Sequence, residues 1–146
     1  MQVEIQIDSN LKQPKLVIYT SEITDEIRQL LEKLNQTSPQ MLTGIRQGNL
    51  EILEQEQLIR IYASNGKVFA EAAKGTYQLR MRLYELEEIL NPRIFVRISN
   101  SEIINLKQAE KFDLSFSGTI CVTLSDGTVT YVSRRYVSKI KQVLGI

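Results

Sequence analysis

Three short polar side chains stand in the middle of an otherwise apolar segment, where they could contact a ligand. Ser99, Asn100 and Ser101 separate the apolar residues of 95–98 from those of 103–106. Asparagine is the side chain that pairs through two atoms with adenine in the DNA major groove, because its amide both donates and accepts a hydrogen bond. On the local sequence, base contact by Asn100 is one interpretation, and an ordinary helix start is the other.

The same segment carries a helix N-terminal signature. Ser99 and Glu102 have the S-x-x-E spacing of a capping box, in which the serine hydroxyl bonds forward to the backbone and the glutamate bonds back. The pattern predicts a helix that starts after Ser99 and points Asn100 and Ser101 outward. The apolar residues that follow are predicted to anchor this start in the core: Ile103, Ile104 and Leu106.

A basic segment follows a predicted strand near residue 132. Arg134 and Arg135 stand at the start of a predicted helix that Ser133 can cap, and Lys139 lies one turn further along. Arginine side chains at such a place could reach a phosphate or the O6 and N7 atoms of guanine, and free backbone N–H groups could bind phosphate. The alternative is a solvated basic face without a ligand.

The composition argues against catalysis. The chain of 146 residues has no histidine and one cysteine, Cys121, which nearly rules out a zinc site and rules out histidine-based acid–base catalysis. Carboxylates cluster at 51–56 and 85–88, where solvated faces are expected, and Asn65-Gly66-Lys67 lacks the glycine spacing of a phosphate-binding loop. We expect that the protein is not an enzyme and that it uses no cofactor, metal or small-molecule substrate. The Cys121 thiol is expected to be buried and inert.

The formal charge of +1 is unevenly distributed. Residues 1–40 hold four basic and six acidic side chains, and the remainder holds fourteen basic and eleven acidic ones. The N-terminus lacks the basic and apolar regions of a leader, and no apolar run approaches the ~20 residues of a membrane span. A soluble, cytoplasmic protein is expected.

The first 40 residues predict a strand–strand–helix extension. Residues 2–7 alternate between apolar and polar, residues 15–19 form a second short apolar run, and a helical pattern ends in a breaker cluster at 35–39. An extension this small is expected to dock onto the rest of the chain, onto a second copy or onto a partner. Its apolar stripe has helical spacing: Ile23, Ile27, Leu30, Leu31 and Leu34.

Residues 41–146 predict a mainly β domain of the α+β class, built from antiparallel hairpins. Helices are expected at 83–90 and 134–144, and turns at 48–49, 64–66, 74–75 and 125–128. The expected strands are 42–47, 50–55, 58–62, 67–73, 76–80, 94–98, 111–116, 119–124 and 129–132.

Four sequence blocks in this domain form a recognisable set. They are Tyr84-Glu85-Leu86-Glu87 with Leu90, then Phe95-x-Arg97-Ile98-Ser99-x-Ser101-x-Ile103-Ile104-Asn105-Leu106, then Leu124-x-Asp126-Gly127, and finally Ser133-Arg134-Arg135-Tyr136-Val137-x-x-Ile140-Lys141. Their order and spacing resemble the LytTR DNA-binding domain over about residues 42–145. The resemblance implies a bacterial transcription regulator, with small stacked antiparallel sheets that present loops and helix starts to successive major grooves.

Carried over by position, the resemblance implies three contact segments. The first is the loop at 64–67, with Asn65 and Lys67, although some family members have a histidine there and this chain has none. The second is Ser99, Asn100 and Ser101. The third is Arg135 with Arg134, and the side chains implied as phosphate contacts are Lys107, Lys139 and Lys141.

The resemblance also implies a set of partners. Residues 1–40 are too short for the receiver domain that the family commonly carries, so the chain resembles the stand-alone type, which is often associated with a membrane protein that restrains the regulator. A homodimer on double-stranded promoter DNA is expected. The main alternative is a protein-interaction module whose basic face binds an acidic protein, followed by an RNA-binding protein and a small enzyme.

Overall fold

The computed structural model describes residues 1–35 and 41–146, and the chain divides into two compact units, residues 1–38 and 39–146. In the described part of the chain, no helix is long and apolar enough to cross a membrane. The same residues contain no group of three or more acidic, histidine or cysteine side chains that could hold a metal ion.

The first unit contains one helix, α1 (Asp25–Asn35). Thr24 caps its N-terminus, because the Thr24 hydroxyl accepts a hydrogen bond from the Ile27 N–H at 3.3 Å. The predicted helix end at 35–39 lies largely outside the described residues. The two predicted strands at 2–7 and 15–19 are wrong, since residues 1–24 contain no strand. A strand needs a hydrogen-bonded neighbour, and this unit supplies none within its described residues.

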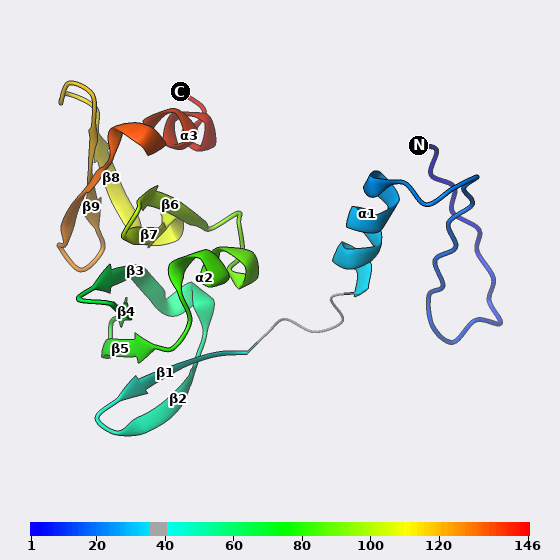
Figure 1. Ribbon diagram of the computed structural model, residues 1–146, viewed down its shortest axis with the longest axis horizontal. Coiled ribbons are helices and arrows are strands. Elements are labelled where there is room, and N and C mark those ends of the chain that lie inside the picture. Colours follow the sequence, from blue (N-terminus) through cyan, green and yellow to red (C-terminus); the bar gives the residue numbers. More distant parts are fainter. Residues whose placement is uncertain (36–40) are drawn as a thin grey trace. The chain divides into compact units, whose positions relative to one another are not determined.

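The second unit contains a seven-stranded antiparallel sheet with the strand order β2-β1-β5-β4-β3-β7-β6 (Figure 1). Hairpins account for most of its pairings, as the sequence predicted, although the first turn lies one residue earlier, at Gln47-Gly48, where φ is 51° and 78°. The strands are β1 (Leu42–Arg46), β2 (Asn49–Leu53), β3 (Leu58–Ser64), β4 (Lys67–Ala72), β5 (Gly75–Leu79), β6 (Phe95–Ser99) and β7 (Glu102–Asn105).

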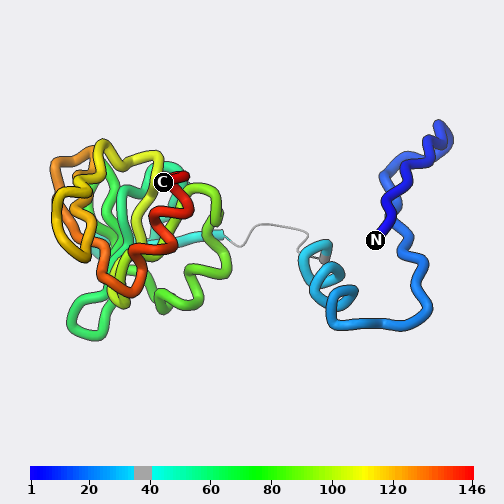
Figure 2. Tube along the Cα trace, turned by 90° about the horizontal axis from the view of Figure 1, so that it is seen from above, coloured from blue at the N-terminus to red at the C-terminus, as the bar shows by residue number. Residues whose placement is uncertain are grey.

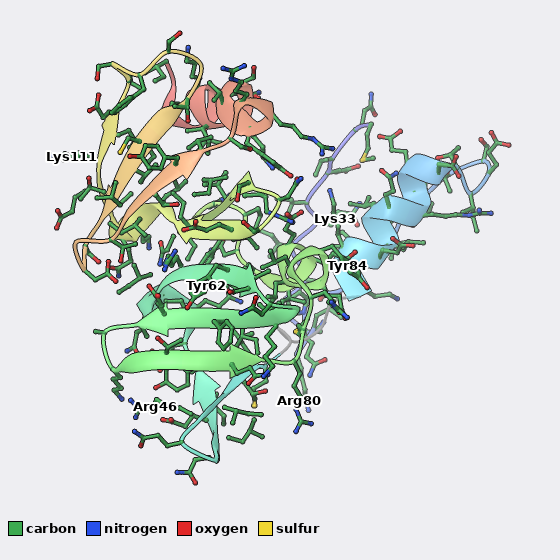
Figure 3. The ribbon with its side chains drawn as sticks, turned by 60° about the vertical axis from the view of Figure 1, so that its left-hand side comes forward. Lys33, Arg46, Tyr62, Arg80, Tyr84 and Lys111 are labelled. Atoms are coloured by element: carbon green, nitrogen blue, oxygen red, sulfur yellow. The ribbon has the colours of Figure 1, made fainter. Side chains whose placement is uncertain are left out.

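A three-stranded sheet, two α-helices and two short 3-10 helices, η1 (Gln55–Gln57) and η2 (Leu106–Gln108), complete this unit. The small sheet has the order β10-β9-β8, with β8 (Ala109–Asp113), β9 (Ile120–Leu124) and β10 (Val129–Val132). Helix α2 (Leu83–Ile89) follows β5, and α3 (Arg134–Leu144) follows β10, both close to their predicted positions. Lys111 lies on the side of the small sheet, and Arg46 lies by the β1–β2 hairpin at the other end of the unit (Figure 3). The prediction of a mainly β, antiparallel fold is confirmed.

The cysteine differs from its prediction. Cys121 is only half-buried, because along β9 the alternate residues Ile120, Val122 and Leu124 face the core and Cys121 lies between them. The thiol therefore lies on the other face of the small sheet.

Strands β6 and β7 are covered on both faces. Phe95 and Ile103 pack with α2 in one apolar cluster, which also includes Leu86. Ile98 and Ile104 pack in a second cluster with the small sheet and with Ile140 of α3. Figure 1 and Figure 2 show α3 lying along this side of the unit, next to β6. Because successive residues of a strand point to opposite faces, a strand buried on both sides is apolar at consecutive positions.

The predicted capping box at 99–102 is wrong. No helix starts there: Ser99 ends β6, Glu102 starts β7, and the residues between them form a hairpin turn. The Ser99 Oγ still accepts a hydrogen bond from the Ser101 N–H at 3.2 Å, but within this turn. Ile103 and Ile104 are buried as predicted, although in a strand.

Glu102 has a long-range role instead of a capping role. Its carboxylate accepts hydrogen bonds from Thr130 Oγ1 at 2.6 Å and from Arg60 at 3.3 Å, and Arg60 also pairs with Glu71 at 2.8 Å. The hydrogen bond to Glu71 raises the pKa of the Arg60 guanidinium, against the opposing effect of burial. This network joins the large sheet to β10 of the small sheet directly behind the 99–101 turn.

We expect Thr130→Val to lower the free energy of unfolding by about 1–3 kcal/mol, because the buried Glu102 carboxylate loses a hydrogen bond while the side-chain volume is kept. Urea unfolding followed by circular dichroism would measure this change. Thr123→Val is the matched control, since Thr123 lies in β9, is half-buried and makes no side-chain hydrogen bond with any described residue. Equal losses in the two variants would contradict a role for the Thr130 hydroxyl.

Candidate nucleic-acid interface

Two hairpin turns lie side by side at one end of the large sheet. The β3–β4 turn contains Asn65, and the β6–β7 turn contains Asn100. Strands β3 and β7 are antiparallel neighbours, with Tyr62 opposite Glu102, so the end of β3 lies beside the start of β7. The Ala63 N–H donates a hydrogen bond to the Ser101 carbonyl at 2.8 Å. The sheet therefore brings together the first two segments that the sequence singled out.

The first turn has a backbone that explains its residues. Asn65 and Gly66 have φ values of 52° and 75°, which is the geometry of a tight two-residue hairpin turn, and Ser64 pairs with Lys67 across it. Asparagine and glycine are the residues that tolerate such positive φ values best. Asn65 and Lys67 are both exposed at this tip.

An arginine side chain holds the second turn. The Arg97 guanidinium donates to the Ser99 carbonyl at 2.7 Å and to the Asn100 carbonyl at 2.5 Å, and it forms an ion pair with Glu87 of α2. A planar guanidinium can serve several acceptors at once in a fixed geometry. The backbone of the turn is therefore tied to α2 as well as to β3.

Helix α3 reaches the same turn from the other side. Its N-terminus is fixed to β6 by a 2.9 Å hydrogen bond from the Ser133 N–H to the Ile98 carbonyl, although the Ser133 side chain makes no cap. The Tyr136 hydroxyl donates to the Asn100 Oδ1 at 3.2 Å. The Arg135 guanidinium lies 6.0 Å from the centre of the Tyr136 ring, within the range of a cation–π contact.

Several cationic side chains surround these three segments. Arg135 and the exposed Lys139 lie four residues apart on α3, and hence on one helix face. An open hollow of about 490 Å³ lies beside the first turn. The cationic side chains that line it are Lys67, Arg82 and Arg97. Tyr84 also lines the hollow, and Figure 3 shows this residue at α2. The surface around both turns therefore combines polar tips with positive charge.

Two of the predicted residues lie elsewhere. Lys107 belongs to the short helix η2 (Leu106–Gln108), which follows the far end of β7, so the length of that strand separates it from the 99–101 turn. Arg134 lies against Gly118 in the loop before β9. The Arg134 Nε is 3.2 Å from the position that a Cβ atom at residue 118 would take. Arg135 and Arg134 thus diverge at the start of α3.

Three residues of this surface were not predicted as part of the site: Arg82, Arg97 and Tyr136. Arg97 and Tyr136 belong to the family-like sequence blocks, but they had no predicted role, and Arg82 precedes a predicted helix. Strand alternation could have suggested that Arg97 faces α2. No local pattern could have suggested the contact between Tyr136 and Asn100, which lie 36 residues apart.

Comparison with known proteins identifies the family of this chain. The family model of the LytTr DNA-binding domain matches residues 48–145, which is more than half of the chain. The chain belongs to the LytTr DNA-binding domain family. This LytTR chain shares 32% identity with an uncharacterized HTH-type transcriptional regulator of Staphylococcus aureus (strain NCTC 8325 / PS 47), over all of its own length and 99% of that protein. A regulator of the same description from strain MRSA252 is 31% identical over the same share of each chain.

A solved structure supports the fold of the LytTR domain. A LytTr DNA-binding domain from Bacillus cereus superposes with a TM-score of 0.70 and 21% identity, covering 73% of this chain and 97% of that one. The resemblance inferred from the four sequence blocks is therefore confirmed, and the family is one of DNA-binding regulators rather than enzymes. The name of the S. aureus relatives refers to a helix-turn-helix, whereas here α2 ends at Ile89 and α3 starts at Arg134. These two helices are not joined by a turn.

We expect Arg97→Lys to lower the free energy of unfolding by about 1–2 kcal/mol, because an ammonium group cannot serve both carbonyls of the turn in the same geometry. The ion pair with Glu87 contributes little to this loss, because the Glu87 side chain is exposed to solvent. Urea unfolding gives the change, and amide chemical shifts of residues 99–101 report whether the turn is disturbed. Arg93→Lys is the control, since Arg93 is exposed and its side chain bonds to no described residue. An unshifted turn in the Arg97 variant would contradict this role.

Proposed function

We propose that this LytTR chain is a sequence-specific regulator of transcription that contacts the major groove of double-stranded DNA through its two hairpin turns and the start of α3. The single observation that carries the proposal is the meeting of Asn100 and Arg135 around Tyr136 on one cationic surface. Asparagine and arginine are the side chains best suited to the major-groove edges of adenine and guanine, respectively.

The surroundings of these two residues suit the sugar–phosphate backbone. Lys67 and Arg82 flank the hairpin turns, and Lys139 continues the positive charge along α3. Contacts of lysine and arginine to phosphate fix the position of a protein on the duplex without selecting a base. In this proposal Asn65 and Ser101 lie at the hairpin tips as further polar contacts, and Ser99 shapes the second turn. Lys107 takes no part, because it follows the opposite end of β7.

A protein with an acidic surface is the alternative partner of the same cationic face. The two proposals differ in one measurable property, because an acidic protein partner requires no preference among DNA sequences. Membership of the LytTr family, together with an asparagine and an arginine at the centre of the surface, favours DNA.

We further propose that the first unit mediates homodimerisation in the cytoplasm. The apolar stripe of α1 includes Leu31 and Leu34, which are 39% and 47% exposed, and Ile23 next to the helix is 64% exposed. A helix with one apolar face normally packs that face against another element. A membrane protein that restrains the regulator is a second partner suited to the same stripe.

Asn100→Ala and Arg135→Ala should each weaken binding to the specific site by roughly 1–3 kcal/mol and leave binding to a shuffled duplex nearly unchanged. Lys107→Ala, the matched control, should leave both affinities unchanged. The measurement is fluorescence anisotropy of labelled promoter DNA and of its shuffled counterpart over a salt series, because non-specific affinity falls steeply with salt.

Different outcomes separate the proposals. Equal losses on the native and shuffled duplexes would mean that Asn100 and Arg135 do not contact bases. If neither duplex binds the wild-type chain at low salt, the cationic surface serves a protein partner instead.

Leu31→Glu should convert the dimer to a monomer, because a charge in the centre of a packed apolar stripe is poorly tolerated, whereas glutamate keeps good helix propensity. Sedimentation equilibrium of the full chain gives the mass of each variant. Lys33→Glu, which also adds negative charge to α1 but lies off the stripe, should remain dimeric. A monomeric wild-type chain, or a Leu31 variant that stays dimeric, would argue against α1 as the interface.

A further inference from the structure

We propose that Tyr136 is a positioning residue that fixes the orientation of the Asn100 amide, so that this position of the DNA site selects adenine over guanine. The inference rests on the proposed function and adds a residue that determines base preference. Its basis is the 3.2 Å hydrogen bond from the Tyr136 hydroxyl to the Asn100 Oδ1.

The backbone around Asn100 is already fixed by other contacts. Arg97 holds the carbonyls of Ser99 and Asn100, and the Ser101 amide donates to the Ser99 hydroxyl. What remains variable is the side chain of Asn100, which is exposed. A half-turn about its last torsion exchanges the oxygen and the nitrogen of the amide, and the two orientations differ only in their hydrogen bonds. In the flipped orientation Nδ2 would have to donate to the Tyr136 oxygen, and a phenol is a weaker acceptor than donor because its lone pair is delocalised into the ring, so the orientation in which Tyr136 donates to Oδ1 is favoured.

The observed orientation has a chemical consequence. With one lone pair of Oδ1 engaged by Tyr136, the second lone pair is still available, and the Nδ2 group bonds to none of the described residues. Adenine offers an N6–H donor and an N7 acceptor side by side in the major groove, which match Oδ1 and Nδ2 of Asn100. Guanine offers two acceptors, O6 and N7, so that O6 would face the Oδ1 oxygen without a proton between them.

The hydroxyl of Tyr136 can be separated from its ring. The ring lies under the Arg135 guanidinium and contributes to the second apolar cluster, so Tyr136→Phe keeps these contacts and removes only the hydroxyl. Tyr131→Phe is the matched control, because Tyr131 lies on β10, is 54% exposed, and its hydroxyl bonds to none of the described residues.

The test is selection of duplexes from a random-sequence library by the full-length wild type, Asn100→Ala, Tyr136→Phe and Tyr131→Phe. We expect the wild type to enrich a site with a preference for adenine at one position. Asn100→Ala should lose the preference at that position. At that same position, Tyr136→Phe should reduce the adenine-to-guanine preference by roughly 3- to 10-fold, the effect of one neutral hydrogen bond. Preferences at the other positions, and all those of Tyr131→Phe, should match the wild type.

Each other outcome overturns the inference in a distinguishable way. If Tyr136→Phe weakens binding equally for all four bases, or leaves the preference intact, the hydroxyl only supports the fold or does nothing. If Asn100→Ala changes no position of an enriched site, Asn100 contacts no base, although the protein still binds specific DNA. If the wild type enriches no sequence at all, the proposed function fails together with the inference.

Discussion

The burial of β6 and β7 on both faces is the constraint on which the rest of the domain depends. Helix α2 covers one face of this pair of strands, and the small sheet with α3 covers the other. All of these elements are therefore packed on the same two strands. The turn between the strands is consequently held from three directions: by Arg97 towards α2, by Ala63 of β3, and by Tyr136 of α3. A turn with so many attachments holds Asn100 in one geometry, which would lower the entropic cost of the DNA contact proposed for it.

The elements of the second unit were largely predictable from sequence because their signals are local. Helix α3 has helical apolar spacing, and the Asn65-Gly66 pair specifies a tight hairpin turn by itself. The capping box failed because a more distant interaction outweighed it: Glu102 pairs with Arg60, 42 residues earlier in the chain, and with Thr130 of the small sheet. The strands predicted at 2–7 and 15–19 failed because alternation predicts a strand only where a neighbouring strand is available.

The candidate site was predictable only in part, because some of its residues carry a local sequence signal and others are brought in by tertiary packing. The types of Asn100 and Arg135, together with the four family-like blocks, indicated two of its central residues. Tyr136 escaped because only the packing of α3 on β6 brings its hydroxyl to Asn100, and no short motif encodes that contact. Lys107, which the family resemblance implied as a phosphate contact, lies away from this surface, because strand β7 runs between the 99–101 turn and residue 107.

The strand order sets the distance between the two hairpin turns that are proposed to contact DNA. The two hairpins occupy the consecutive strands β4-β3-β7-β6, so their centres are two strand spacings apart, or roughly 10 Å at the usual separation of hydrogen-bonded strands. Base pairs rise by about 3.4 Å each, so this interval would correspond to roughly three steps if both turns contact the duplex as proposed, in line with its axis. Backbone hydrogen bonds fix this interval in the protein, so in the proposed complex a mismatch with the geometry of the duplex would have to be absorbed by bending or twisting of the DNA.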